Sequence, residues 1–178
     1  MEIGCGKSTK TILRGIQKNK EEGNETKFTG IEPYPDQETR GIHSPGFNLI
    51  QESIQKVPLS VFSDADLLFI DSSHVSKIGS DVNYEILEII PTLKVGALVH
   101  WHDIVMPSEY FRSWVMDMGM FWNESYLVQS FMMFNKSFQI IWASQYLQLK
   151  HSQALKESFD FYQPNNDTLT SFWIQRVA

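Results

Sequence analysis

Short apolar runs alternate with amphipathic stretches along the chain, and this alternation limits the possible folds more than any other feature of the sequence. The pattern is typical of strands and helices that take turns in a mostly parallel sheet. The apolar runs predict strands at residues 27–31, 47–51, 66–71, 95–101, 138–142 and 169–177. The amphipathic stretches predict helices at residues 7–20, 81–93, 122–134 and 145–159, with a turn at 163–167. We therefore expect an α/β domain.

The composition fits a single domain that spans residues 1–178. With 42% hydrophobic and 20% charged residues, the chain can bury a sizeable core. Its net charge of −6 argues against a nucleic-acid partner, because phosphate binding needs clustered Lys and Arg. The one cysteine, Cys5, cannot form an internal disulfide, and the sequence has no signal-peptide pattern and no membrane-spanning apolar run. We expect a cytoplasmic protein without a membrane partner.

A glycine loop near the N-terminus is followed by an acidic residue at the spacing of a nucleoside site. Gly4 and Gly6 allow a sharp turn ahead of a helix whose free N–H groups favour an anion. Glu32 ends a predicted strand 26 residues after Gly6, where a carboxylate can accept both hydroxyls of a ribose. The pair predicts a nucleoside cofactor, although a structural turn with a surface glutamate gives the same pattern. We interpret Cys5 as a space-filling residue, because no base is implied beside it.

The same loop also resembles a phosphate-binding P-loop through Gly6, Lys7 and Ser8. Asp71 ends an apolar strand, as the magnesium-binding aspartate of such proteins does. The P-loop pattern requires a glycine five residues ahead of its Gly-Lys pair, and Met1 occupies that position. A nucleotide triphosphatase is therefore the weaker alternative.

Only Met1, Glu2 and Ile3 precede the glycine loop, although a loop of this kind needs a full strand leading into it. We expect the first strand to be cut short and the domain to be incomplete at its N-terminus. Unpaired backbone groups on the neighbouring strands would follow.

Two groups of polar residues follow two predicted strands. Asp71 and His74 follow one strand, and His102 and Asp103 follow the next. Because parallel strands end at the same edge of a sheet, we expect both groups and the glycine loop to share one crevice. Asp and His side chains suit a divalent metal that keeps open positions for substrate. A helix N-cap at Asp71 and a loop-stabilising His102–Asp103 pair are the structural alternatives, and His100 fits a core histidine.

With these motifs, the chain resembles the class I S-adenosylmethionine (SAM)-dependent methyltransferases, and more narrowly methyltransferase domain family 24. The resemblance spans nearly the whole chain. The segments that carry it are residues 2–9 (EIGCGKST), 31–35 (IEPYP), 68–74 (LFIDSSH), 77–83 (KIGSDVN), 100–104 (HWHDI), 121–127 (FWNESYL) and 171–173 (SFW). It implies a Rossmann-like, doubly wound, seven-stranded and mostly parallel sheet in the order 3-2-1-4-5-7-6, with a reversed last strand.

Carried over by position, the resemblance implies a SAM site on the glycine loop. The residues that would surround the methionine part of SAM are Glu2, Gly4, Gly6 and Ser8. The residues that would lie along the nucleoside are Glu32 at the ribose, and Ser53 and Gln55 near the adenine.

The resemblance also assigns roles to the polar residues that follow the two strands, Asp71, His74, His102 and Asp103. Metal-dependent relatives such as catechol O-methyltransferase carry a carboxylate at the position of Asp71, a lysine base at that of His74, and an Asp-Asn pair at that of His102 and Asp103. These substitutions keep groups that are competent to bind a metal or move a proton.

The sequence therefore predicts methyl transfer from SAM to a hydroxyl, or alternatively a nitrogen, of a small molecule. A divalent metal such as Mg²⁺, held by Asp71, His102 and Asp103, would lower the pKa of the hydroxyl, and His74 would take its proton. Without a metal, His74 or His102 would act alone. A catalytically inactive, cofactor-binding paralogue is the other alternative.

Overall fold

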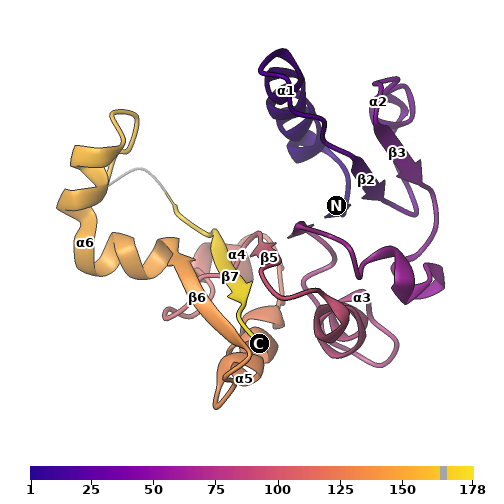
Figure 1. Cartoon of the computed structure of the whole chain (residues 1–178). Helices are drawn as coiled ribbons and strands as arrows, with labels where there is room; N and C mark the ends of the chain where they lie inside the picture. Colours follow the sequence, from indigo (N-terminus) through magenta and orange to yellow (C-terminus); the bar gives the residue numbers. More distant parts are fainter. Residues whose placement is uncertain (165–167) are drawn as a thin grey trace.

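The computed structural model describes residues 1–164 and 168–178 and contains one seven-stranded sheet in the order β3-β2-β1-β4-β5-β7-β6 (Figure 1). Strands β1 to β5 pair in parallel, whereas β7 is antiparallel to both of its neighbours. The strands are β1 (Glu2–Ile3), β2 (Phe28–Ile31), β3 (Phe47–Ile50), β4 (Leu67–Ile70), β5 (Leu98–Trp101), β6 (Phe138–Ala143) and β7 (Phe172–Arg176). This topology confirms the predicted doubly wound α/β fold and its strand order.

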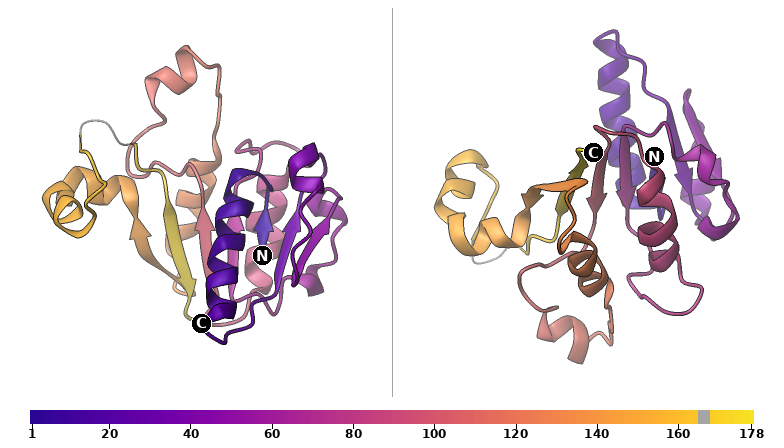
Figure 2. Two further views of the ribbon diagram at one scale, coloured as in Figure 1. Left: turned by 90° about the horizontal axis from the view of Figure 1, so that it is seen from above. Right: turned by 60° about the horizontal axis from the view of Figure 1, so that its bottom comes forward.

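Helices flank the sheet on both faces, with α1 on one face and α3 and α5 on the other, while α6 extends away from the sheet beyond β6 (Figure 2). The α-helices are α1 (Lys7–Glu21), α2 (Gln37–Arg40), α3 (Asp81–Tyr84), α4 (Arg112–Met116), α5 (Glu124–Met132) and α6 (Ser144–Ser158). The other helical turns are η1 (Ile54–Lys56), η2 (Leu59–Val61), η3 (Glu85–Ile89) and η4 (Ile90–Thr92).

Strand β1 has two residues and lies at the centre of the sheet. Ile3 is in register with Ile31 on β2 and with Ile70 on β4. Beyond the strand, the Gly4 N–H donates to the Ile31 carbonyl at 3.0 Å, and the Asp71 N–H donates to the Ile3 carbonyl at 2.9 Å. The short strand thus holds the glycine loop between the carboxyl ends of β2 and β4.

The core lies mainly between the sheet and the helices on the α3 and α5 face. Trp101 and Phe172 are cross-strand partners and are both almost completely buried. The helices contribute Val82, Ile86 and Val128 to the same apolar cluster. Burial of this kind stabilises a domain by roughly 25 cal/mol per Å² of apolar surface.

The helical segment predicted at 81–93 changes its character along its length. It begins as α3, continues as the π-helical turn η3, and ends as the 3₁₀ turn η4. Pro91 has no backbone N–H, so a regular α-helical hydrogen bond cannot form at this position. The periodic apolar pattern predicted most of the buried side correctly, but it also placed Leu87 there, and Leu87 is 60% exposed. The pattern carried no information on this change of helix type.

Other predicted elements differ from the observed ones mainly at their ends. The strand predicted at 95–101 begins only at Leu98, and the strand predicted at 169–177 begins at Phe172. Helices α2 and α4 were not predicted, because both are single short turns without a repeating apolar face. The turn predicted at 163–167 extends into residues 165–167, which lie outside the described residues.

Within the described part of the chain, no helix has the length and apolar character needed to cross a bilayer.

Gly4 is the residue on which the turn after β1 depends. Its φ is +83°, and a Cβ at this position would overlap the carbonyl oxygen of Asp71. We expect Gly4→Ala to lower the free energy of unfolding by about 1–3 kcal/mol or more, from backbone strain and from this overlap. Denaturant unfolding monitored by circular dichroism would measure it.

Gly15→Ala is the matched control. Gly15 lies inside α1, where a Cβ would meet no atom within 4 Å. The same substitution should stabilise the protein there, by roughly 0.5–1 kcal/mol, because alanine loses less backbone entropy in a helix. Equal effects of the two variants would contradict the special role of Gly4.

Candidate active site

A pocket of about 440 Å³ lies at the carboxyl ends of β1, β2 and β4. Its lining includes four of the seven residues predicted to bind the cofactor, namely Gly4, Glu32, Ser53 and Gln55. Asp71, from the second predicted group, lines the same pocket. In doubly wound sheets ligands bind outside the carboxyl ends of the strands, which is where this pocket lies.

Local hydrogen bonds fix the walls of the pocket. The Tyr34 N–H donates to Glu32 Oε1 at 2.8 Å, which holds the carboxylate at the end of β2. The Gln55 amide donates to the Gly79 carbonyl at 3.1 Å and joins the segment after β3 to the loop before α3. The second carboxylate oxygen of Glu32 keeps its capacity to accept a hydroxyl.

The other three predicted cofactor residues, Glu2, Gly6 and Ser8, do not line this pocket. Glu2 is completely buried, and its Oε2 accepts a hydrogen bond from the Thr9 hydroxyl at 2.6 Å. The Thr9 oxygen in turn accepts from the Gly6 N–H at 2.9 Å. Burial raises the pKa of Glu2, against hydrogen bonds from Ser8 and Thr9 that lower it. In the structure Glu2 therefore supports the glycine loop through Thr9 and does not face the pocket.

Cys5 lies in the same loop, and its properties fit the space-filling role that the sequence suggested. Burial, with a smaller contribution from the charge of Glu2, raises the pKa of its thiol to about 12. The side chain is therefore a neutral thiol at physiological pH, which fits packing rather than nucleophilic chemistry.

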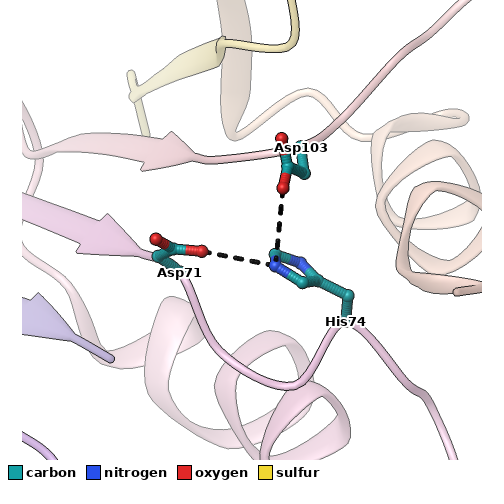
Figure 3. A group of neighbouring side chains, drawn as sticks. All are labelled: Asp71, His74 and Asp103. Carbon is teal, nitrogen blue, oxygen red and sulfur yellow. Dashed lines mark ion pairs between the residues drawn. The ribbon is translucent and has the colours of Figure 1, made fainter. Parts of the chain in front are cut away.

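The residues after β4 and β5 converge beside the pocket. His74 lies between the carboxylates of Asp71 and Asp103 (Figure 3), with Nε2 3.3 Å from Asp71 Oδ1 and 3.9 Å from Asp103 Oδ2. One donor atom from each of these residues lies within 4.8 Å of the others. The strands explain this convergence, because Ile70 and Trp101 are register partners in parallel β4 and β5.

Backbone conformation also directs these side chains. His74 has a φ of 58° and Asp103 a φ of 56°, the left-handed region that residues other than glycine rarely adopt. Such conformations persist where the surroundings enforce them, and they cluster at functional sites.

Two carboxylates, Asp71 and Glu124, determine the charge of His74. Burial alone would lower its pKa, but the hydrogen bonds that the imidazole donates to Asp71 and Glu124, together with the negative charges of those two residues, outweigh burial and raise the pKa to about 10. In the absence of a metal the imidazole is therefore positively charged at neutral pH. A charged imidazole cannot accept a proton, so His74 in this state is not a general base.

His102 is more accessible than His74 and lies on the other side of Asp103. Its side chain is 44% exposed, compared with 6% for His74. His102 Nδ1 is 3.1 Å from Asp103 Oδ1, and this contact with Asp103 raises the pKa of His102. The Thr170 hydroxyl also donates to Asp103 Oδ1, at 2.9 Å, and anchors the carboxylate to the segment before β7.

His100 is a core histidine, as its place on the strand suggested, and one of its two ring nitrogens is hydrogen-bonded. It is 4% exposed, and its Nε2 lies 2.8 Å from the Ser171 hydroxyl. The rings of Phe69 and Trp173 flank it, with centroids 4.4 and 4.5 Å away. Burial lowers the pKa of His100 to about 4, so it stays neutral and outside the charged cluster.

Glu124 belongs to this cluster but was not predicted. It is completely buried at the start of α5, with Oε2 2.8 Å from His74 Nδ1. The sequence carried one signal, an acidic residue that begins an otherwise apolar helix. That signal also fits a favourable charge at a helix N-terminus, so it could not identify a buried partner of a histidine.

Comparison with known proteins agrees with this architecture. The family model for the methyltransferase domain, methyltransferase domain family 24, matches residues 1–104. The chain belongs to this family. The family and the fold are those of SAM-dependent methyltransferases, enzymes that transfer methyl groups. This assignment answers the P-loop alternative, because the glycine loop is that of a methyltransferase domain.

Solved structures of low sequence identity share the fold of this methyltransferase. Two are crystal structures of the plantazolicin methyltransferase BpumL in complex with SAH and with a triazolic or a monoazolic desmethylPZN analogue. Both are 13% identical to this chain and cover 99% of it, with TM-scores of 0.56 and 0.55 over 76% and 75% of the BpumL chain.

A more distant structure is that of a mutant 16S rRNA (adenine(1408)-N(1))-methyltransferase with SAM from Catenulisporales acidiphilia, at 12% identity and a TM-score of 0.43, covering 99% of this chain and 84% of that one. None of the curated proteins matches the sequence.

Proposed function

We propose that this methyltransferase transfers the methyl group of SAM to a hydroxyl oxygen of a small molecule. The observation that carries the proposal is the position of Asp71, which lines the pocket and also lies 3.3 Å from His74. The cofactor pocket and the acid–base cluster therefore adjoin each other. An acceptor bound over the cluster lies next to the sulfonium methyl, which is the arrangement that in-line transfer requires.

The residues of the pocket fit SAM in chemistry and in position. The Glu32 carboxylate is available for the ribose hydroxyls, and Gly4 lets the backbone approach the ligand without a side chain. Ser53 and Gln55 line the side of the pocket assigned to the adenine. SAM supplies an activated methyl group, so the protein mainly has to bind, align and deprotonate the acceptor.

The donor set beside the pocket fits a divalent metal such as Mg²⁺. Among the described residues, one set of three metal-ligating side chains lies close enough together, and it consists of Asp71, His74 and Asp103. The sequence assigned His102 to the metal and His74 to the proton, and burial favours the reverse. His74 is enclosed by carboxylates, whereas His102 is accessible to an acceptor. A bound metal would supply Lewis-acid stabilisation of the acceptor oxyanion.

His102 is the residue that we assign to proton removal. Its ring is half-exposed, and its Nδ1 lies 3.1 Å from Asp103 Oδ1. Asp103 in turn accepts a hydrogen bond from Thr170, so the segment before β7 holds the carboxylate that contacts His102. The same arrangement serves a metal-free reaction, in which His102 takes the hydroxyl proton by itself.

The acceptor class rests on charge and on the donor set. The net charge of −6 disfavours a polyanionic acceptor such as RNA. Carboxylates and imidazoles are suited to deprotonating a hydroxyl, which favours oxygen over nitrogen as the methyl acceptor.

Glu32 tests the cofactor site. We expect Glu32→Ala to weaken binding of SAM by about 1–3 kcal/mol, or roughly 5- to 150-fold, because the ribose loses a charged hydrogen-bond acceptor. Isothermal titration calorimetry would measure the affinity. Glu52→Ala is the control, since Glu52 is an exposed glutamate paired with Lys56. Unchanged affinity in Glu32→Ala would reject the ribose assignment.

Removal of divalent metals tests the acceptor site. If Asp71, His74 and Asp103 hold a metal that the reaction needs, treatment with a chelator abolishes methyl transfer, and added Mg²⁺ restores it. Transfer would be followed by mass spectrometry of the acceptor. Full activity in excess chelator would reject the metal and leave His102 as the sole activating group.

His102 tests the assignment of the base. His102→Asn should lower kcat by roughly 100-fold or more, within the range of general-base contributions, and leave the affinity for SAM unchanged. His43→Asn is a control for loss of an imidazole outside the site. A chain that binds SAM but never methylates any acceptor, even before substitution, would instead support the inactive paralogue.

A further inference from the structure

The strongest unexplained feature of the cluster is Glu124, a carboxylate that is completely enclosed by protein. Its Oε2 lies 2.8 Å from His74 Nδ1, the nitrogen that points away from Asp71 and Asp103. Its other oxygen, Oε1, is buried without a hydrogen-bond partner among the described residues. Burying a carboxylate costs several kcal/mol, which apolar packing at the same position would avoid.

The segment that carries Glu124 is fastened directly to the His74 loop. The backbone N–H groups of Asn123 and Glu124 both donate to the His74 carbonyl, at 3.1 and 3.3 Å. The Asn123 side chain accepts from the Ser76 N–H at 2.6 Å and donates to the Ser76 carbonyl at 3.1 Å. The Trp122 ring lies against the imidazole, with centroids 4.4 Å apart. These contacts hold His74 in its left-handed backbone conformation.

We propose that Glu124 is a positioning residue for His74. Its carboxylate accepts the Nδ1–H of the imidazole, and this hydrogen bond directs Nε2 at Asp71 and Asp103. A histidine that binds a metal through one nitrogen almost always donates its other N–H to a carboxylate, a carbonyl or water, and the bond fixes its tautomer and orientation. The hydrogen bond between Glu124 and His74 does not depend on the proposed function. Only the binding of a metal by His74 Nε2 rests on it.

A purely structural role for Glu124 accounts less well for the geometry. The backbone N–H of Glu124 already fastens α5 to the His74 loop, and that bond needs no carboxylate. The side chain adds one directed contact, and that contact is to the imidazole. We therefore attribute the buried carboxylate to its hydrogen bond with His74 Nδ1.

Nuclear magnetic resonance of the wild-type protein tests the hydrogen bond without any cofactor or metal. We expect a downfield, slowly exchanging imidazole N–H proton on His74 Nδ1, assigned by its loss in His74→Gln. In Glu124→Gln, which keeps the shape but replaces a charged acceptor with a neutral one, this signal should move upfield and exchange faster. A wild-type spectrum in which His74 Nδ1 carries no protected proton would overturn the proposal, whether or not the variant folds.

Metal affinity gives a second readout that a packing role would not move. We expect Glu124→Gln to weaken binding of Mn²⁺, measured by electron paramagnetic resonance, by roughly 10- to 100-fold. Glu85→Gln is the matched control, because Glu85 is also completely buried but accepts a hydrogen bond from Ser72 rather than from His74. Equal losses in both variants would show a general effect of altering a buried carboxyl group and would overturn the proposal.

The outcomes separate this inference from the proposed function. A normal Nδ1–H signal that responds to Glu124→Gln, in a protein that transfers no methyl group, supports the positioning role and contradicts the proposed activity. Retained Mn²⁺ affinity and an unchanged signal in Glu124→Gln, in a protein that methylates its acceptor, contradict the positioning role alone.

Discussion

The parallel pairing of β4 with β1 on one side and β5 on the other is the constraint on which the rest of the site depends. Because all three strands run in the same direction, the residues that follow them emerge at one edge of the sheet. Gly4 follows β1, Asp71 follows β4, and Asp103 lies just beyond β5. No long-range contact other than the strand ladder is needed to bring these segments together. The cofactor pocket and the charged cluster are therefore products of the same backbone hydrogen bonds.

The ion pairs of the charged cluster contribute little net stability, because their attraction is close to the cost of burying the charges. At an effective dielectric constant of about 20, two opposite charges 4 Å apart attract each other by about 4 kcal/mol, which is similar to the cost of desolvating each ion. His74 lies within 3.9 Å of three carboxyl groups, those of Asp71, Asp103 and Glu124. A divalent cation would favour carboxyl groups gathered in this way, which is a further reason to propose the cluster as a ligand set.

Support for the cluster comes from parts of the chain that are distant in sequence. Thr170, ahead of β7, holds Asp103, and the segment Trp122 to Glu124 holds His74. The antiparallel β7 is what brings Thr170 to the carboxyl end of β5, since Trp101 and Phe172 are register partners. A reversed last strand thus contributes to the site as well as to the core.

The alternation of apolar and amphipathic segments was sufficient to predict the fold class, because periodicity depends only on which residues face the core. The resemblance supplied the strand order, including the reversed β7. Local signals also located Gly4, Glu32, Asp71 and Asp103, since each stands at the end of a strand where the backbone leaves the sheet. The ends of β5 and β7 were not predictable, because hydrogen-bond pairing rather than hydrophobic pattern decides them. Pro91 marks a break in the predicted helix, but it does not indicate that the preceding turn η3 is π-helical.

The roles of the two histidines were decided only by tertiary structure. Sequence alone determined that His74 and His102 follow neighbouring strands, and both have the chemistry of a base or a ligand. Which one is enclosed by carboxylates and which one remains accessible depends on Glu124, which lies 50 residues beyond His74 in the chain. Burial and charge are sums over all neighbours in space, and for His74 a decisive neighbour is distant in sequence. The sequence therefore identified the two histidines as candidates, and the folded structure determined the burial and the charged neighbours of each.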